Sequence, residues 1–131
     1  MARMIAFMLA AAMLIGATQV MAAEGNVRTC ALTRGIQCLP DEKCQDWTMA
    51  EMGLPAFVRV DLNSKTITSL DKDIPRSSKI ASVERLQGVV VMHGTELRGW
   101  SMAVAEDSGV LTLSASGDSE AFIVFGTCVK P

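Results

Sequence analysis

The stretch of sequence that decides the fold covers residues 87–127 and reads QGVVVMHGTELRGWSMAVAEDSGVLTLSASGDSEAFIVFGT. Apolar and polar residues alternate along most of it, and short groups of Gly, Asp and Ser interrupt the alternation at regular intervals. This pattern is typical of antiparallel strands joined by tight turns. Working outward, the same pattern extends back to residue 56. It predicts seven strands, at 57–62, 65–70, 78–86, 89–93, 97–105, 110–116 and 120–127.

Residues 24–55 follow no such pattern, and they contain three of the four cysteines. Within them we expect one further strand at 27–32, a turn at Arg34-Gly35 and one helical turn at Met49–Met52. Strands joined by such short loops pair with their neighbours in sequence. Eight twisted strands are enough for a small sheet to close on itself. The sequence therefore predicts an all-β fold: a small antiparallel meander closing into a barrel of about eight strands, braced by disulfides. A sandwich or a half-open barrel is the alternative.

The first 23 residues are set apart by their composition, since nineteen of them are apolar. Arg3 precedes an unbroken apolar run, Met4–Ile15, and small residues follow as far as Ala22. This order is typical of a signal peptide, whereas a membrane span needs about 20 apolar residues. We therefore expect a signal peptide at 1–22, a Cys-rich irregular segment with the first strand at 23–55, and the antiparallel meander at 56–131. The last two segments should form one domain, located in the periplasm or secreted.

The four cysteines, Cys30, Cys38, Cys44 and Cys128, all lie after this leader. An even number in a small exported chain predicts two disulfides. A zinc site is the alternative, but no two cysteines have the C-x₂₋₄-C spacing that structural zinc sites use. If the first strand pairs with the last, Cys30 lies beside Cys128, and Cys38 is left to pair with Cys44. This is the pairing we expect among the three that four cysteines allow.

Charge and motifs exclude several classes of function. The chain has 12 Lys and Arg against 14 Asp and Glu, a net charge of −2, and the two signs are interspersed. Nucleic acids and anionic membranes are recognised by clustered Lys and Arg, so neither is an expected partner. No segment has the D-x-D-x-D-G spacing of a calcium loop. We expect no metal and no cofactor.

Catalytic chemistry has little support in the sequence. His93 is the only histidine, and it ends a Val-rich strand before Gly94, where a solvated histidine is ordinary. Ser101 lies outside any G-x-S-x-G motif, so a nucleophilic serine is not indicated. The acidic residues occur in turns, which favour Asp for conformational reasons. The sequence therefore indicates a protein that is not an enzyme, with a small hydrolase as the third choice of function.

Two places carry residues beyond those that folding needs. The segment 93–100 places His93, Glu96, Arg98 and Trp100 around two glycines, and Trp and Arg are common anchors of binding surfaces. Trp47, in the Cys-rich loop, is the second candidate anchor. The simpler interpretation is that Trp100 fills the end of the barrel with Arg98 at its rim. Loops alternate between the two ends of a barrel, so the two places need not lie together, and we expect the binding site at 93–100.

Short motifs add a resemblance. Arg98-Gly99-Trp100-Ser101, Val124-Phe125-Gly126-Thr127-Cys128 and Val60-Asp61-Leu62 resemble a group of small exported, signal-peptide-bearing proteins of alphaproteobacteria. The resemblance implies a bacterial periplasmic setting and no known activity, so no functional residue is carried over. The expected architecture is also similar to that of the periplasmic inhibitors of C-type lysozyme, which are disulfide-braced eight-stranded barrels. Their Ser-Gly and Tyr loop motif is missing, since this chain has no tyrosine.

These observations together predict an exported, monomeric binding module that is not an enzyme and binds a periplasmic or extracellular protein in an inhibitor-like manner. A barrel that carries a small ligand is the alternative. With strands of five to nine residues, we expect apolar side chains to fill most of the interior. A ligand carrier would instead enclose a cavity of a few hundred Å³.

Overall fold

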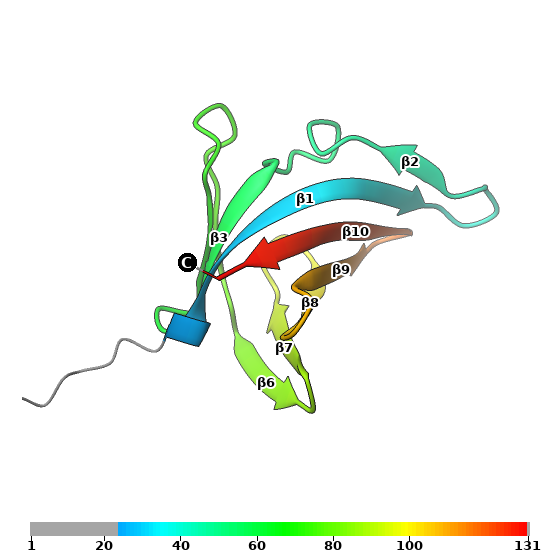
Figure 1. Ribbon diagram of the computed structural model, residues 1–131. Helices are drawn as coiled ribbons and strands as arrows, with labels where there is room; N and C mark the ends of the chain where they lie inside the picture. Colours follow the sequence, from blue (N-terminus) through cyan, green and yellow to red (C-terminus); the bar gives the residue numbers. More distant parts are fainter. Residues whose placement is uncertain (1–23, 131) are drawn as a thin grey trace, which may run out of the picture.

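The computed structural model describes residues 24–130, and the expected signal peptide at 1–22 lies outside them. A 3-10 turn at Glu24–Asn26 precedes ten strands (Figure 1). These are β1 (Val27–Cys38), β2 (Gln45–Trp47), β3 (Phe57–Asp61), β4 (Thr66–Ser69), β5 (Ser77–Lys79), β6 (Ser82–Leu86), β7 (Val89–Gly94), β8 (Gly99–Ala105), β9 (Val110–Gly117) and β10 (Glu120–Val129). Within the described residues there is no α-helix, and hence no helix long and apolar enough to cross a membrane.

The strands form one antiparallel sheet that curls into a half-barrel. Its order is β5-β4-β3-β1-β10-β9-β8-β7-β6, and β2 pairs separately with β1. The two end strands, β5 and β6, are consecutive in sequence, with only Ile80 and Ala81 between them. The sheet therefore curls until its two edges meet at this link, although the edges do not pair with each other. The predicted all-β, antiparallel, barrel-like fold is confirmed.

The single strand expected at 78–86 is wrong in detail. The chain bends at Ile80, whose side chain is buried in the core. Before the bend β5 pairs with β4, and after it β6 pairs with β7. One stretch of alternating apolar and polar residues therefore forms both edge strands of the sheet. The alternation alone does not indicate where the stretch is divided.

The two longest strands, β1 and β10, run side by side through the middle of the sheet (Figure 1). Their ladder shifts between Leu32 and Arg34, so Thr33 is an extra residue, a β-bulge that bends β1. On its other edge β1 pairs first with β3 and then, beyond the bulge, with β2. The turn expected at Arg34-Gly35 is therefore wrong, because pairing with β10 carries the strand on to Cys38.

Both expected disulfides are present. Cys30–Cys128 joins residues that face each other across β1 and β10, and 98 residues separate them in sequence. Cys38–Cys44 closes the short loop between β1 and β2. In the chain-entropy model the long loop contributes about 4–5 kcal/mol to stability and the short one about 2 kcal/mol. Such bridges are typical of proteins that fold in oxidising compartments.

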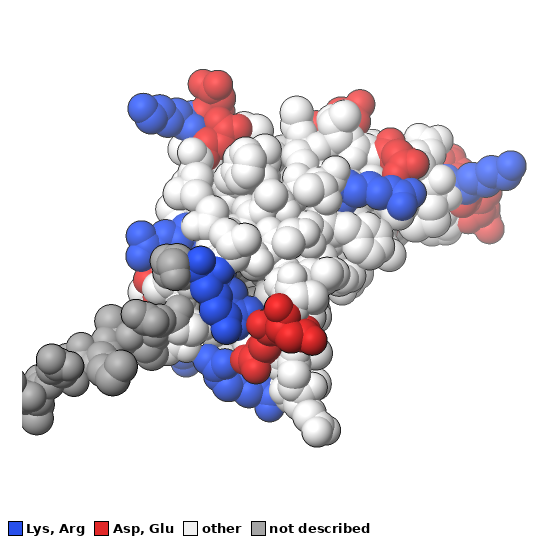
Figure 2. Space-filling view, in the orientation of Figure 1, with Lys and Arg blue, Asp and Glu red and all other residues white. Residues whose placement is uncertain are grey.

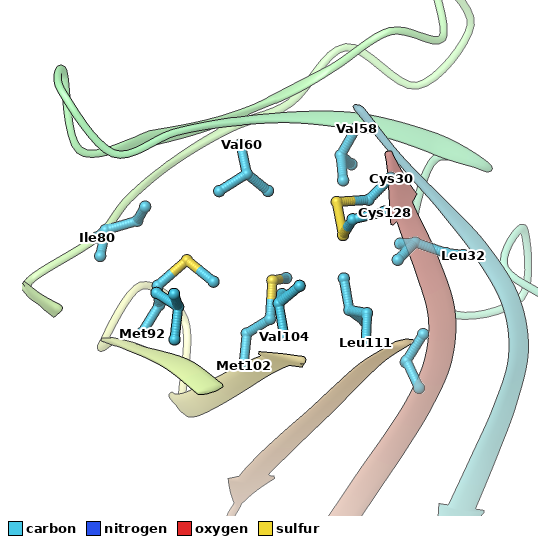
Figure 3. Packing of buried hydrophobic residues seen from close by; sticks show 12 residues of the cluster. Cys30, Leu32, Val58, Val60, Ile80, Met92, Met102, Val104, Leu111 and Cys128 are labelled. Atoms are coloured by element: carbon cyan, nitrogen blue, oxygen red, sulfur yellow. A yellow bond between two sulfur atoms is a disulfide. The ribbon is translucent and has the colours of Figure 1, made fainter. Parts of the chain in front are cut away.

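The core lies inside the curled sheet, between β3 on one side and β7, β8 and β9 on the other (Figure 3). Inward-facing residues alternate along each strand as the sequence predicts, and Leu111 and Val124 are completely buried. The twelve core residues are Cys30, Leu32, Val58, Val60, Ile80, Val90, Met92, Met102, Val104, Leu111, Val124 and Cys128. The disulfide Cys30–Cys128 is thus part of the core.

One end of the half-barrel is filled by a buried arginine. Arg28 precedes Cys30 on the inward face of β1 and is only 4% exposed. Its Nη2 lies 4.0 Å from Oε1 of Glu106, which also accepts a hydrogen bond of 2.9 Å from Nη1 of Arg85. Arg28, Arg85 and Glu106 therefore form a cluster of charged side chains at this end of the half-barrel.

The outer face of the sheet is poor in charge. Figure 2 shows few charged side chains over the middle of β1, β3 and β10. On the outer faces of β3 and β10, Phe57 and Val129 are 53% and 62% exposed. Phe57 is therefore an exposed aromatic residue on the outer face, on the other side of the sheet from the interior.

Candidate binding site

A pocket of about 190 Å³ lies at the end of the half-barrel opposite Arg28. Along β8 the inward side chains pass from Val104 in the core, through Met102, to Trp100 in the pocket. The pocket floor is formed by core residues, and its walls are mainly apolar. Its apolar lining is Leu32, Met52, Leu54, Pro55, Val58, Ile67, Leu97, Trp100, Met102, Leu113, Ala115, Phe122 and Val124, and its polar lining is Ser69, Arg76, Ser78, Glu96 and Arg98.

Trp100 is fixed against a glycine of the neighbouring strand. It pairs with Gly94 across β7 and β8, and a Cβ atom at Gly94 would overlap the indole ring. The ring occupies the space that a side chain at position 94 would need. Aromatic residues paired with a glycine on a neighbouring strand are known to stabilise glycine in sheets. The indole is half-buried and packs on the core from one side while lining the pocket from the other.

Arg98 is held in the pocket wall. Its Nη1 donates a hydrogen bond of 2.8 Å to Oε1 of Glu120, and Nε2 of Gln37 donates one of 3.2 Å to the other carboxylate oxygen. The guanidinium also lies over the ring of Phe122, at 4.8 Å from its centroid. The side chain is 33% exposed. Arg98 is therefore a partly buried wall residue that positions Phe122, and its charge is already neutralised.

Trp47 reaches the same aromatic ring. It is the last residue of β2 and pairs with Gly35 of β1. Its ring lies 5.9 Å from that of Phe122, edge to face. Phe122 therefore contacts both Trp47 and Arg98. The sequence left open whether the two segments lie together, and the structure brings them together, because the bulge at Thr33 and the continuation of β1 carry β2 to the start of β10.

The segment between β2 and β3 forms another part of the pocket. Thr48 and Glu51 hydrogen-bond each other reciprocally, in the manner of a helix capping box. The pKa of Glu51 is held below its usual value, chiefly by the hydrogen bond from the backbone N–H of Thr48 and secondly by the one from its hydroxyl. The turn they stabilise brings the thioether of Met52 over Gly35, in the space that a Cβ atom at this position would occupy. Met52 and Leu54 then line the pocket.

Two charged side chains at the mouth, Arg76 and Glu96, have no oppositely charged neighbour among the described residues. Glu96 is exposed on the β7–β8 hairpin, next to Leu97, which is 82% exposed. Arg76, on the opposite side, donates only a long hydrogen bond of 3.4 Å to the carbonyl oxygen of Gly53. Within residues 24–130 neither side chain has an oppositely charged group within 4.0 Å. The unpaired charges of the mouth are therefore Arg76 and Glu96.

His93 lies apart from the other predicted site residues. It is opposite Ser101 on β7 and β8, between Met92 and Gly94, which both face inward. Alternation along the strand places its side chain on the outer face. The structure thus brings Trp47, Glu96, Arg98 and Trp100 to one end of the half-barrel and leaves His93 out. Among the described residues there is no group of three His, Cys, Asp or Glu side chains that could hold a metal ion.

Sequence reasoning missed Phe122, Met52 and Arg76. Phe122 could have been found, because it is an inward-facing aromatic residue near the start of β10, beyond the level of the core. Met52 and Arg76 lie in connecting segments without periodicity, so only the folded chain places them at the pocket. A comparison with models of known protein families finds no match, and comparisons with curated proteins and with solved structures find none either.

Proposed function

We propose that this protein is an exported binding module, without catalytic activity of its own, that holds a protein partner by an apolar side chain inserted into the pocket. The observation that carries the proposal is the size of the pocket, about 190 Å³, together with its apolar walls. A cavity of about 150 Å³ accommodates a benzene molecule, whereas pockets for drug-sized ligands measure about 300–1,000 Å³. The pocket therefore fits one large side chain.

The surroundings of the pocket also support a protein partner. Interfaces concentrate their binding energy in apolar or aromatic anchors that enter pockets, surrounded by a rim that excludes water. Here the apolar side chain of Leu97 and the charged side chains of Arg76 and Glu96 form such a rim. The wall made by Phe122, Trp47 and Arg98 is held by stacking and by an ion pair. A rigid wall lowers the entropic cost of binding.

Export to the periplasm is supported by two independent features. The apolar leader at 1–22 has the order of a signal peptide. The protein also has two disulfides. Disulfides persist in oxidising compartments and are rare in the reducing cytosol. The partner should accordingly be a periplasmic or extracellular protein.

A small-ligand carrier is the second candidate, and the same pocket favours it. Its volume would suit one aromatic ring or a short aliphatic chain. The two functions differ in what surrounds the bound group. A carrier needs only the pocket, whereas a protein-binding module also uses the exposed rim at Leu97, Arg76 and Glu96.

The test is capture of a partner from periplasmic extract by the oxidised, exported protein and by pocket-filling variants. Ala115→Phe fills the pocket from β9, while Ser114→Phe places the same ring on the outer face of the same strand. Phe57→Ser removes an exposed aromatic residue from the outer face of β3. We expect Ala115→Phe to abolish capture and both control variants to retain it.

Equal capture by Ala115→Phe would contradict the proposal, and loss of capture by Phe57→Ser alone would move the site to the outer face. Loss of capture by Leu97→Ser, with toluene still bound in the pocket, would favour the protein-binding module over the carrier.

A further inference from the structure

One edge of the sheet beside the pocket has unpaired backbone groups. Strand β5 is the end strand of the sheet and pairs only with β4. The carbonyl oxygen of Arg76 accepts from Ser69, and the N–H of Ile80 donates to Lys65, so the backbone groups of Arg76, Ser78 and Ile80 point toward β4. Those of Ser77 and Lys79 consequently point away from it. Within residues 24–130 they have no hydrogen-bond partner.

This open edge borders the mouth of the pocket. Arg76 and Ser78 direct their side chains inward and line the pocket. Across the mouth stands the β7–β8 hairpin with Glu96 and Leu97. If the β6–β7 ladder continued, it would connect β5 with the β7–β8 hairpin across the mouth. Its last hydrogen bond, however, runs from the N–H of Ala81 to the carbonyl oxygen of His93. The missing part of the ladder is therefore at the pocket itself.

We propose that the partner supplies an extended segment that pairs antiparallel with the open edge of β5 and inserts one apolar side chain into the pocket. This inference rests on the proposed function and names the kind of partner. Edge pairing supplies main-chain hydrogen bonds, while a pocket for alternate side chains supplies specificity. Residues of the partner opposite Ser77 and Lys79 bond to β5, and the residues between them face the pocket.

Charge adds a second requirement for the partner segment. Arg76 lies at the mouth with no carboxylate within 4.0 Å among the described residues, and Lys79 follows on the same edge. Side chains two positions apart in a strand share a face. An acidic residue two positions from the apolar anchor therefore lies on the same face as the anchor, next to Arg76. We expect the partner segment to contain both an apolar anchor and this acidic residue.

The test measures binding of the capped peptide acetyl-Thr-Phe-Thr-Glu-Thr-amide to the exported protein. Because Trp47 and Trp100 are the only tryptophans and the chain lacks tyrosine, intrinsic fluorescence reports from this end of the molecule. In one analogue the amides of the first and second threonines, which lie opposite Lys79 and Ser77, carry N-methyl groups, which removes donors that face β5. In the matched analogue the amides of phenylalanine and glutamate are methylated, and these face away from β5.

We expect methylation of the threonines to weaken binding about tenfold or more, because two main-chain hydrogen bonds are lost. Methylation of the other two amides should change binding less than about threefold, because these amides make no bond to β5. Lys79→Pro removes one edge donor of the protein without touching the β4 ladder, and Lys79→Ala is its control. We expect Lys79→Pro, but not Lys79→Ala, to weaken binding of the peptide. Neither substitution should change binding of acetyl-phenylalanine amide.

Other outcomes overturn one claim or the other. If the peptide binds no more tightly than acetyl-phenylalanine amide, or if both methylated analogues bind alike, the strand-pairing inference is wrong while the pocket remains. If neither compound binds, the proposed function is wrong as well. A dimer of the protein alone in sedimentation, abolished by Lys79→Pro, would make a second copy the occupant of the edge and would also overturn the inference.

Discussion

At the scale of single residues, the candidate site consists of side chains whose positions are fixed by their neighbours. Trp100 depends on the absence of a side chain at Gly94, and Arg98 depends on Glu120 and on the ring of Phe122. The sequence predicted Arg98 as a free anchor of binding. Its charge is instead neutralised within the wall. Arg76, which the sequence did not indicate, is the cation at the mouth that has no carboxylate partner within residues 24–130.

Substitution of Gly94 by alanine should destabilise the protein by about 1–3 kcal/mol, because the new Cβ overlaps the indole of Trp100 and overpacking has costs of this size. Gly99→Ala, on the neighbouring strand, is the control, since no atom lies within 4 Å of its added Cβ. Urea unfolding of both variants measures the difference. A Gly94→Ala variant as stable as Gly99→Ala would show that the indole does not lie over Gly94.

Removal of the Arg98 side chain should lower the free energy of unfolding by about 1 kcal/mol. The ion pair with Glu120 is one-third exposed, so screening limits its value, and the stacking on Phe122 adds a similar small amount. Arg34→Ala is the matched control, because the Arg34–Asp46 pair has a similar distance of 2.9 Å but is largely exposed. We expect that control to lose less than about 0.5 kcal/mol. A loss of several kcal/mol for Arg98→Ala would identify a structural core residue.

At the scale of elements, some strands are determined by the local sequence pattern and others by tertiary pairing. The alternation from Val89 to Thr127 predicts β7, β8, β9 and β10, because strands joined by tight turns are specified by nearby residues. The cysteine pairing follows from the closure of that meander. Strand β2 and the open edge of β5 could not be predicted, because the first requires the bulge at Thr33 and the second the bend at Ile80. Both are long-range consequences of the curled sheet.

The two disulfides should contribute unequally. Replacing Cys30 and Cys128 together by alanine should cost about 4–5 kcal/mol, and replacing Cys38 and Cys44 about 2 kcal/mol, because the closed loops differ greatly in length. The second variant should also change Trp47 fluorescence, since β2 has three residues and pairs only with β1. Unfolding in urea without reductant provides both values. The reverse order would contradict the assignment of the long bridge to the core.

At the scale of the whole molecule, the half-barrel has two different ends. The end at Arg28 is filled by side chains, and the other holds the pocket between an open strand edge and an exposed hairpin. The sequence predicts the curled sheet and three of the residues lining this pocket. It did not indicate the pocket, because the pocket exists only where the β6–β7 ladder stops and β5 is left unpaired.

The central claim, that this pocket is the binding site, is tested most directly by nuclear magnetic resonance of the two indole N–H groups during titration with acetyl-phenylalanine amide. Trp100 lines the pocket, whereas Trp47 reaches it only through Phe122. We expect a saturable shift of the Trp100 signal, a smaller shift of the Trp47 signal, and loss of both shifts in Ala115→Phe but not in Ser114→Phe. If both indole signals stay in place at saturating concentrations, the pocket is not the binding site. The same holds if the signals shift as much in Ala115→Phe as in the unsubstituted protein.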